Sequence, residues 1–320
     1  MITLQDIQSA HDRIRHAVTR TPVMTSHAVD EMAGCRVFFK CENFQKVGAF
    51  KFRGAYNAVS QLTEAEKQQG VIAHSSGNHA QALALASSML GVKAVIVMPR
   101  NSSKVKIEAT RGYGAEVVFC APTLESRTTT TQKLIAEHGY VLIHPYNDPR
   151  VIAGAGTAAL ELIEEIGCVD YLFVPVGGGG LLSGSSIAVK GRCGKSKVIG
   201  VEPKNADDAY RSFRAKKLQP SVDPQTIADG LRTSLGETGF KIILQNVDDI
   251  MTVTEAEIIA AMRILWERMK LVVEPSGAVP LAGVLAAHER VRAAKIGVIL
   301  SGGNVDLDGM FREYELSIVK

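Results

Sequence analysis

Short apolar runs alternate with helical stretches over residues 71–143. The runs are VIAHS, AVIVMP, AEVVFC and YVLIHP, and they are separated by NHAQALALASSML, SSKVKIEATRG and TLESRTTTTQKLIAEHG. Strands that are separated by helices of this length cannot pair as hairpins, so they predict βαβ units and a parallel sheet. The same rhythm resumes at YLFVPV, residues 171–176, and again at KIGVILSGG near the C-terminus. The sequence therefore predicts an α/β fold.

Helix starts are marked locally. TEAE occurs at residues 63–66 and at residues 254–257, and both are capping boxes, in which a threonine and a glutamate three residues later satisfy the first N–H groups of a helix. No linker rich in proline or serine divides the 320 residues. Any two lobes are therefore expected to be interleaved in the sequence.

The composition argues against several classes of protein. The net charge is +3, and no basic run is interleaved with aromatic side chains, so we expect no nucleic-acid partner. No window approaches the roughly 18 uninterrupted apolar residues of a membrane span, so we expect no membrane partner. The first residues, MITLQDIQSAHDRIRH, lack the apolar core of a signal peptide. We therefore expect a cytoplasmic protein.

The cysteines support the same location. Their number is odd and no pair has C-x-x-C spacing, which argues against a disulfide framework or a zinc site and favours a reducing compartment. We expect each to be a small buried side chain, although any one could be a reactive thiol. The five are Cys35, Cys41, Cys120, Cys168 and Cys193.

Four consecutive glycines follow YLFVPV and precede an apolar helical stretch. Each glycine loses much backbone freedom on folding. In return, the backbone can approach a ligand closely, and N–H groups beside a helix N-terminus suit a phosphate. A tight strand-to-helix turn is the alternative, but it needs one or two glycines rather than four. The residues are Gly177, Gly178, Gly179 and Gly180.

Other glycine patterns narrow the kind of ligand. The nucleoside-triphosphate pattern G-x-x-x-x-G-K-[ST] is absent. A dinucleotide-like G-x-G-x-x-A occurs at residues 154–159, but the preceding HPYNDPRV is broken by proline, so we interpret the pattern as packing at a helix start. SSGNHA at 75–80 and SGGN at 301–304 also follow predicted strands. Ligands of open parallel sheets lie beyond the carboxyl ends of strands, so these loops predict one crevice for a small phosphorylated cofactor.

Lys51 is the candidate nucleophile, and it lies between Phe50 and Phe52 in KVGAFKFRGA. On an edge strand, alternation would turn both phenylalanines inward and the lysine into water. In an apolar pocket, the pKa of the lysine would instead be lowered, and its amine would be free for Schiff-base chemistry. Such a lysine, a phosphate cup and polar loops together suggest pyridoxal phosphate.

Seven motifs occur in order along nearly the whole chain: FQKVGAFKFRGA, SSGNHAQA, PVGGGGLLSG, VEPKNADDAYRS, TIADG, VEPSGA and SGGNVD. In these motifs the chain resembles the fold-type-II pyridoxal-phosphate enzymes, and among them the group of serine racemase and the serine, threonine and 3-hydroxyaspartate dehydratases. The resemblance implies a tryptophan synthase β-like α/β fold, with two open, mostly parallel sheets and helices on both faces. It also implies a large cofactor-binding domain from residues 1–55 and 145–320 and a small domain from 56–144.

The resemblance implies roles for individual residues around the cofactor. Lys51 would bind it covalently, Phe50 would pack against its ring, and Asn78 would hydrogen-bond its 3-hydroxyl. Ser301 would meet the pyridine nitrogen, Gly230 would lie against the ring, and the four glycines would hold the phosphate.

Further residues are implied at the substrate. Ser76, Asn78 and His79 would bind its carboxylate, with Arg127 and Thr233 nearby. Ser76 is also a candidate acid for the second face of the substrate α-carbon, and the alternative is a carboxylate ligand only. The second serine of SSGN is the racemase-like residue.

A divalent cation is implied as well. Glu202, the carbonyl of Ala206 and Asp208 would bind Mg²⁺ or Ca²⁺, which prefer oxygen ligands. Without the resemblance, this segment would be interpreted as a solvated loop. One departure from the family lies in GAGT, where Ala155 stands in place of the usual glutamine and removes a polar group near the cleft.

The implied function is that of a homodimeric serine racemase with serine/threonine dehydratase activity on small amino acids. One alternative is a 3-hydroxyaspartate ammonia-lyase, in which Arg127 or Arg232 would bind the second carboxylate. For either arginine, the alternative is a solvated side chain or a structural role. A more remote alternative is a non-catalytic amino-acid-binding module, against which the intact Lys51 argues.

Overall fold

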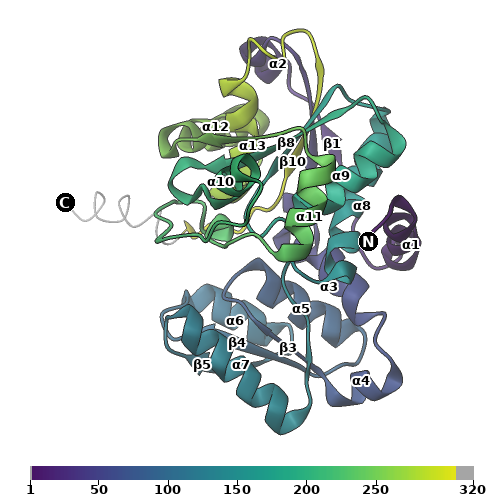
Figure 1. The fold of residues 1–320 in the computed structure, drawn as a ribbon, viewed down its shortest axis with the longest axis vertical. Helices are drawn as coiled ribbons and strands as arrows, with labels where there is room; N and C mark the ends of the chain where they lie inside the picture. Colours follow the sequence, from purple (N-terminus) through teal and green to yellow (C-terminus); the bar gives the residue numbers. More distant parts are fainter. Residues whose placement is uncertain (1, 308–320) are drawn as a thin grey trace, which may run out of the picture.

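The computed structural model describes residues 2–307 and shows two lobes, each built on its own sheet (Figure 1). The larger sheet has the strand order β1-β2-β10-β7-β8-β9, and the smaller has the order β5-β4-β3-β6. The strands pair in parallel except for β1 with β2. The predicted α/β fold with two mostly parallel sheets is confirmed.

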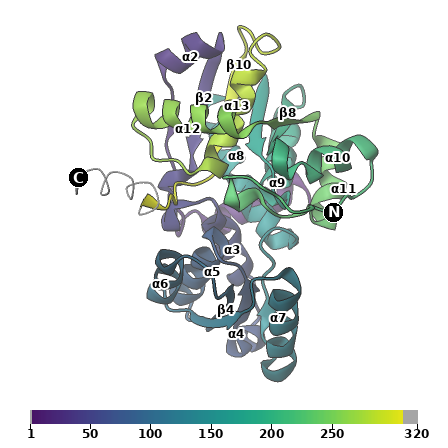
Figure 2. The same cartoon turned by 90° about the vertical axis from the view of Figure 1, so that its left-hand side faces the viewer.

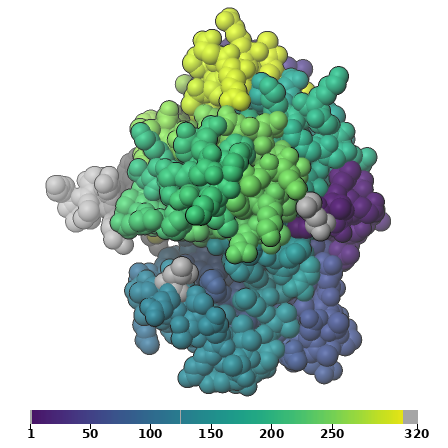
Figure 3. Space-filling view, in the orientation of Figure 1, coloured from purple at the N-terminus to yellow at the C-terminus, as the bar shows by residue number. Residues whose placement is uncertain are grey.

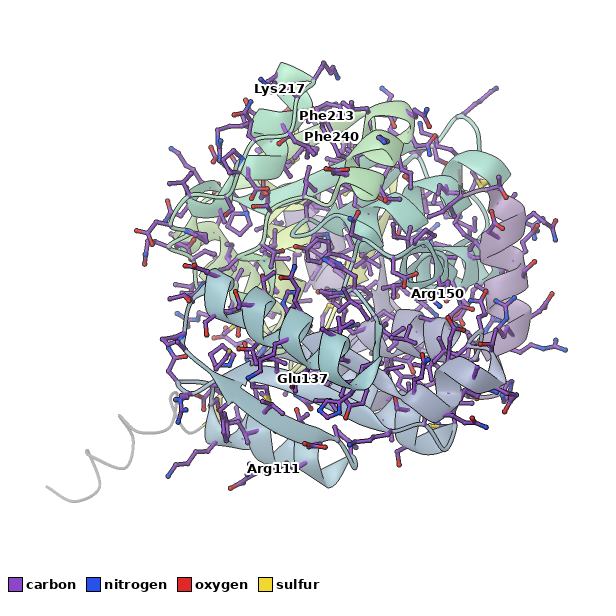
Figure 4. The ribbon with its side chains drawn as sticks, turned by 60° about the horizontal axis from the view of Figure 1, so that its bottom comes forward. Arg111, Glu137, Arg150, Phe213, Lys217 and Phe240 are labelled. Atoms are coloured by element: carbon purple, nitrogen blue, oxygen red, sulfur yellow. A yellow bond between two sulfur atoms is a disulfide. The ribbon has the colours of Figure 1, made fainter. Side chains whose placement is uncertain are left out.

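The larger sheet is covered by helices on both faces. Its strands are β1 (Val23–Met24), β2 (Arg36–Cys41), β7 (Tyr171–Pro175), β8 (Lys197–Pro203), β9 (Asp249–Val253) and β10 (Lys295–Leu300). One face packs on α1 (Leu4–Ile14), α8 (Pro149–Ile166), α9 (Gly180–Arg192), α10 (Asp208–Ala215) and α11 (Glu237–Asn246). The other face packs on α2 (His27–Ala33), α12 (Glu255–Met269) and α13 (Pro275–Ala286). Phe213 of α10 and Phe240 of α11 lie together on the first face (Figure 4).

The smaller sheet contains β3 (Val71–His74), β4 (Ala94–Pro99), β5 (Glu116–Cys120) and β6 (Val141–Leu142). Its helices are α4 (Glu64–Gln69), α5 (Asn78–Met89), α6 (Lys104–Gly112) and α7 (Leu124–His138). Helix α3 (Lys51–Val59) packs on both α5 and α8 and so connects the lobes (Figure 2). The surface is hollowed between the two lobes (Figure 3). The remaining short helices are η1 (Glu42–Phe44), η2 (Lys46–Gly48), η3 (Lys204–Ala206) and η4 (Asp229–Leu231).

Helix caps and helix contacts explain the junction of the lobes. Both predicted capping boxes are present at the starts of α4 and α12. The glycine pattern at 154–159 lies inside α8, not at a helix start as predicted, because α8 already begins at Pro149. A Cβ at Gly154 would lie 2.6 Å from the Arg53 carbonyl, and one at Gly156 would lie 2.7 Å from the Gly184 carbonyl. These two glycines therefore let α3 and α9 approach α8 closely.

The expectation that no disulfide forms is wrong, because Cys168 and Cys193 are joined. Cys168 is also exposed, contrary to the expected burial. The two residues are 25 apart in the sequence and meet because α8 and α9 lie side by side and end at the same edge of the lobe. The other three cysteines are free and buried, as predicted. None of the helices in residues 2–307 is long and apolar enough to cross a membrane.

Candidate active site

Lys51 is the first residue of α3, which removes the edge-strand alternative. The N–H of Phe50 donates to the Ser301 carbonyl at 3.0 Å, so the start of α3 is tied to the carboxyl end of β10. The Nζ of Lys51 donates to the Pro145 carbonyl at 2.8 Å. Burial lowers the pKa of Lys51 to about 8, although Glu274 opposes the shift. A fraction of this amine is therefore unprotonated near neutral pH.

The predicted phosphate cup lies between β7 and α9. Gly180 is the first residue of α9, and its N-cap Gly179 has φ +86°, a left-handed conformation that favours glycine. A Cβ at Gly178 would collide with the ring of Tyr146. The backbone here has no room for side chains, and the first N–H groups of α9 are available to an anion. The sequence analysis missed Tyr146, whose ring closes this side of the cup.

The loop around η4 lies beside the cup. A Cβ at Gly177 would lie 3.2 Å from both the Gly230 carbonyl and the Thr233 Oγ1. The N–H of Gly230 donates to the Ser276 Oγ at 3.1 Å. The structure therefore brings Gly230 and Thr233 to the glycine loop, as the predicted site requires.

Asn78 begins α5 at the carboxyl end of β3. Its Nδ2 donates to Glu274 Oε1 at 2.8 Å, and its Oδ1 accepts from Asn304 Nδ2 at 2.8 Å. Burial and the charge of Asp229 raise the pKa of Glu274 to about 8. The sequence analysis assigned no role to Glu274, although the motif VEPSGA contains it. The Glu274 carboxyl group therefore accepts a hydrogen bond from Asn78, the candidate ligand of the cofactor, and its charge also influences the pKa of Lys51.

Ser76 and His79 flank the start of α5. Ser76 is half-buried in the loop after β3. The His79 Nε2 donates to the Ile143 carbonyl at 3.0 Å, and its Nδ1 is buried without a partner among the described residues. Burial lowers the pKa of His79 to about 3, so the ring is neutral. His79 can therefore serve a carboxylate through its backbone N–H at the start of α5 rather than through a charged imidazole.

Basic side chains gather on the small-lobe side of Lys51. The ring centroids of His74 and His144 lie 6.3 Å apart. Burial and the nearby Arg127 lower the pKa of His74, while burial, His74 and Lys51 lower that of His144 to about 4. The Nε of Arg127 is buried and has no partner in the described part of the chain. Sequence reasoning missed both histidines, because His74 ends β3 and His144 follows β6, two strands that are far apart in sequence.

Arg232, the other arginine considered for a second carboxylate, is held by its own loop. Its Nε donates to the Thr226 carbonyl at 2.8 Å, and its Nη2 donates to the same oxygen. This arrangement favours the structural alternative for Arg232.

The predicted cation ligands lie between β8 and α10. Glu202 accepts from the N–H groups of Ala209 and Tyr210 at 3.1 and 2.9 Å. Burial and Asp208 raise the pKa of Glu202 well above its usual range, and burial raises that of Asp208 to about 6. The Oδ1 of Asp208 is buried without a partner among residues 2–307, and Ala206 lies between the two carboxyl groups in sequence and is buried. Two buried carboxyl groups and an unpaired oxygen fit a cation that prefers oxygen ligands.

The remaining geometry fits pyridoxal phosphate. The glycine cup suits its phosphate, the Lys51 amine suits its aldehyde, and Ser301, buried after β10, is tied to Phe50 beside that lysine. The cup and the lysine follow different strands, but both lie at the carboxyl ends of the large sheet. This is where ligands of open parallel sheets bind.

Comparison with known proteins leads to the same cofactor. The profile of the family described as "Pyridoxal-phosphate dependent enzyme" matches residues 14–302. An L-threo-3-hydroxyaspartate ammonia-lyase of Saccharomyces cerevisiae is 50% identical over 306 residues, which are 95% of this chain and 94% of the relative. A serine racemase of Dictyostelium discoideum is 48% identical over 313 residues, 97% of each chain. The crystal structure of serine racemase from Dictyostelium discoideum has a TM-score of 0.92 at 48% identity, and the match covers 95% of this chain and 99% of that chain. The chain therefore belongs to the family of pyridoxal-phosphate-dependent enzymes.

Proposed function

We propose that the protein is a serine racemase with serine/threonine dehydratase activity. The observation that carries this proposal is the partly unprotonated amine of Lys51 in α3, which packs on α5. Its Nζ bonds the carbonyl of Pro145, and the next residue, Tyr146, packs on the glycine cup. The relative named serine racemase supports it. Membership of an enzyme family argues against the non-catalytic binding module.

Pyridoxal phosphate, when bound, supplies an electron sink for a carbanion at the substrate α-carbon. The N–H groups of the four glycines and of α9 would hold its phosphate, Phe50 and Gly230 would contact its ring, and Asn78 would bond its 3-hydroxyl. Ser301 would face the pyridine nitrogen with a neutral hydroxyl. A neutral partner stabilises the carbanion less than a carboxylate would. Loss of a β-hydroxyl from the substrate therefore competes well with slower reactions such as transamination.

Proton transfer at the α-carbon falls to two residues of the chain. The Lys51 amine would remove the α-proton on one face, while the first N–H groups of α5 bind the substrate carboxylate. Ser76, in the loop before α5, would serve the opposite face. Dehydration of L-serine needs only the Lys51 face, whereas racemisation needs both.

The experiment that tests this proposal compares Ser76→Ala with the wild type. We expect the variant to lose L-to-D conversion and D-serine breakdown while it keeps much of its L-serine dehydration. The readouts are chiral analysis of serine and release of keto acid, and the ratio of the activities is diagnostic because lost carboxylate binding would lower them together. A wild type that makes no D-serine would exclude the racemase. An equal loss of all activities would make Ser76 a binding group only.

A 3-hydroxyaspartate ammonia-lyase is the second candidate function. The observation that favours it is the group of Arg127, His74 and His144, with a buried Arg127 nitrogen that has no partner in the described residues. A guanidinium with free donors suits a second carboxylate. The Saccharomyces cerevisiae relative carries the name of this activity.

Arg127→Met separates the two substrates. We expect kcat/KM for 3-hydroxyaspartate to fall about 100-fold and that for serine less than about 3-fold, because only the first substrate leaves a buried carboxylate unpaired. Arg232→Met is the matched control, since Arg232 bonds its own loop, and it should affect both substrates alike. Equal losses for both substrates in Arg127→Met would remove Arg127 from substrate recognition.

We also propose that Glu202, the Ala206 carbonyl and Asp208 bind Mg²⁺ or Ca²⁺ as a structural ion. The unpaired Asp208 oxygen supports this assignment. We propose further that the protein is a cytoplasmic homodimer. Each subunit would have a large domain of residues 1–55 and 145–320 and a small domain of residues 56–144. Light scattering of the holoenzyme measures the assembly.

A further inference from the structure

A basic cavity of about 590 Å³ opens on the large lobe, away from the candidate active site. It is lined by Tyr171 and Lys197, the first residues of β7 and β8, and by Ala294 just before β10. The glycine cup, Glu202 and Ser301 lie at the opposite, carboxyl ends of these strands. The cavity therefore shares no residue with the proposed catalytic site.

The charge of the cavity is strongly positive. Four cationic side chains line it, and Asp170 is the one acidic residue among the described residues that do so. Arg290 is paired with Asp249 at 2.9 Å. The other three form no ion pair within residues 2–307, and they are Lys195, Lys197 and Arg292. The Nζ of Lys197 lies 5.5 Å from the centroid of the Tyr171 ring. Such a cluster raises the local concentration of small anions.

The Cys168–Cys193 disulfide forms part of the wall of the same cavity. Cys168 is exposed, whereas Cys193 is only 7% exposed. Because thiol–disulfide exchange requires a thiolate to reach one of the two sulfurs, access selects Cys168 as the sulfur that is attacked. The surrounding cations favour an attacking thiolate that carries further negative charge.

We propose that this cavity is a thiol–disulfide exchange site for small thiols that carry carboxylates, of which glutathione is an example. The sulfur of the first thiolate bonds to Cys168 Sγ, the disulfide breaks, and Cys193 leaves as a thiolate that takes up a proton. A second thiolate then attacks the ligand sulfur of the mixed disulfide and releases Cys168, which is protonated in turn. In total, two thiols are oxidised to one small disulfide, and the protein gains two electrons and two protons.

The test measures how fast different thiols reduce the disulfide in the holoenzyme. Rate constants for glutathione and for the cationic thiol cysteamine are each divided by that thiol's rate constant with a neutral small disulfide, which removes differences in intrinsic reactivity. We expect the normalised rates to favour glutathione by about 10-fold at low salt. The preference should disappear as ionic strength rises from about 0.01 M to about 1 M, because the screening length falls from about 30 Å to about 3 Å.

Two variants link this preference to the cavity. Lys195→Glu with Arg292→Glu should reduce the normalised glutathione preference about 10-fold or reverse it. Lys217→Glu with Lys241→Glu changes the net charge equally at exposed lysines outside the cavity, and it should leave the preference unchanged (Lys217 is labelled in Figure 4). Alkylation followed by mass spectrometry should locate the mixed disulfide on Cys168.

Several results would overturn the proposal. They are equal normalised rates in the wild type at low salt, a preference that survives the Lys195→Glu/Arg292→Glu change, or a mixed disulfide on Cys193. None of these results bears on Lys51 or Ser76, so the proposed function and the exchange site can fail independently.

Discussion

Lys51 combines two properties: a half-buried amine with a lowered pKa and a place at the first turn of a helix. Burial lowers its pKa to about 8, and the bond between Phe50 and Ser301 holds the backbone beside it. The side chain is therefore ready to bind an aldehyde and, once released, to accept a proton.

Lys51→Ala should abolish catalysis, with a loss of at least about 10³-fold, because covalent binding and proton transfer both use this amine. Borohydride reduction of the loaded wild type, followed by peptide mass analysis, should place the cofactor on the peptide that contains Lys51. Lys51→Arg is the matched variant that keeps the positive charge, and it should fail as well because a guanidinium stays protonated. Normal turnover in either variant would contradict the assignment.

Because of Glu274, we expect the free energy of unfolding of the apoprotein to depend on pH. Its pKa rises from 4.5 to about 8 on folding, so between these values the folded state holds a proton that the unfolded state has lost. Stability therefore contains a contribution from Glu274 that falls as pH rises through this window, by up to about 1.4 kcal/mol per pH unit. Glu274→Gln should remove it, and urea unfolding at a series of pH values measures the difference. Identical pH profiles for the two proteins would show that Glu274 ionises normally.

At the scale of elements, a buried ionic network joins α3, α8 and β2. The guanidinium of Arg53 in α3 donates to Glu42 and to Glu161 at 2.7 Å, and Lys40 of β2 donates to Glu161 at 2.7 Å. All four side chains are almost fully buried. Because Arg53 lies two residues after Lys51, this network fixes the helix that carries the proposed nucleophile.

Arg53→Met should lower the free energy of unfolding by about 3–5 kcal/mol, because the buried Glu42 would lose its ion pair and Glu161 would keep only the one with Lys40. The exposed pair Arg263–Glu267 offers the matched control, and Arg263→Met should cost less than about 1 kcal/mol. Urea unfolding at constant pH measures both changes. Similar small effects would mean that the network does not fix α3.

At the scale of the whole molecule, the proposed cation would tie β8 to the start of α10. Chelation should lower the melting temperature and the activity together, because an ion that binds only the folded state stabilises it by mass action. Asp208→Asn should reproduce the effect and abolish the response to chelator. Asp207→Asn is the control, since Asp207 pairs with Arg211 at 2.7 Å, and it should keep the response. A chelator that changes neither quantity would show that no such ion is bound.

Local sequence determined a large part of the fold and of the cofactor site. The alternation of apolar runs and helices predicted the parallel sheets, and TEAE marked the starts of α4 and α12. Four glycines in a row predicted the tight turn into α9, and the ordered motifs predicted Lys51 as the nucleophile, a role that stays a prediction. These features are readable because capping, periodicity and close backbone approach depend on residues that are neighbours in the chain.

Tertiary structure alone decided the remaining contacts. Glu274 meets Asn78, His74 meets His144, and Cys168 meets Cys193, although each pair is far apart in sequence. The glycines of 154–159 likewise became packing positions inside α8 only when α3 and α9 were placed against it. The physical reason is that burial, charge interaction and covalent pairing depend on distances in space. Those distances are set by the packing of whole helices and strands, which no local pattern encodes.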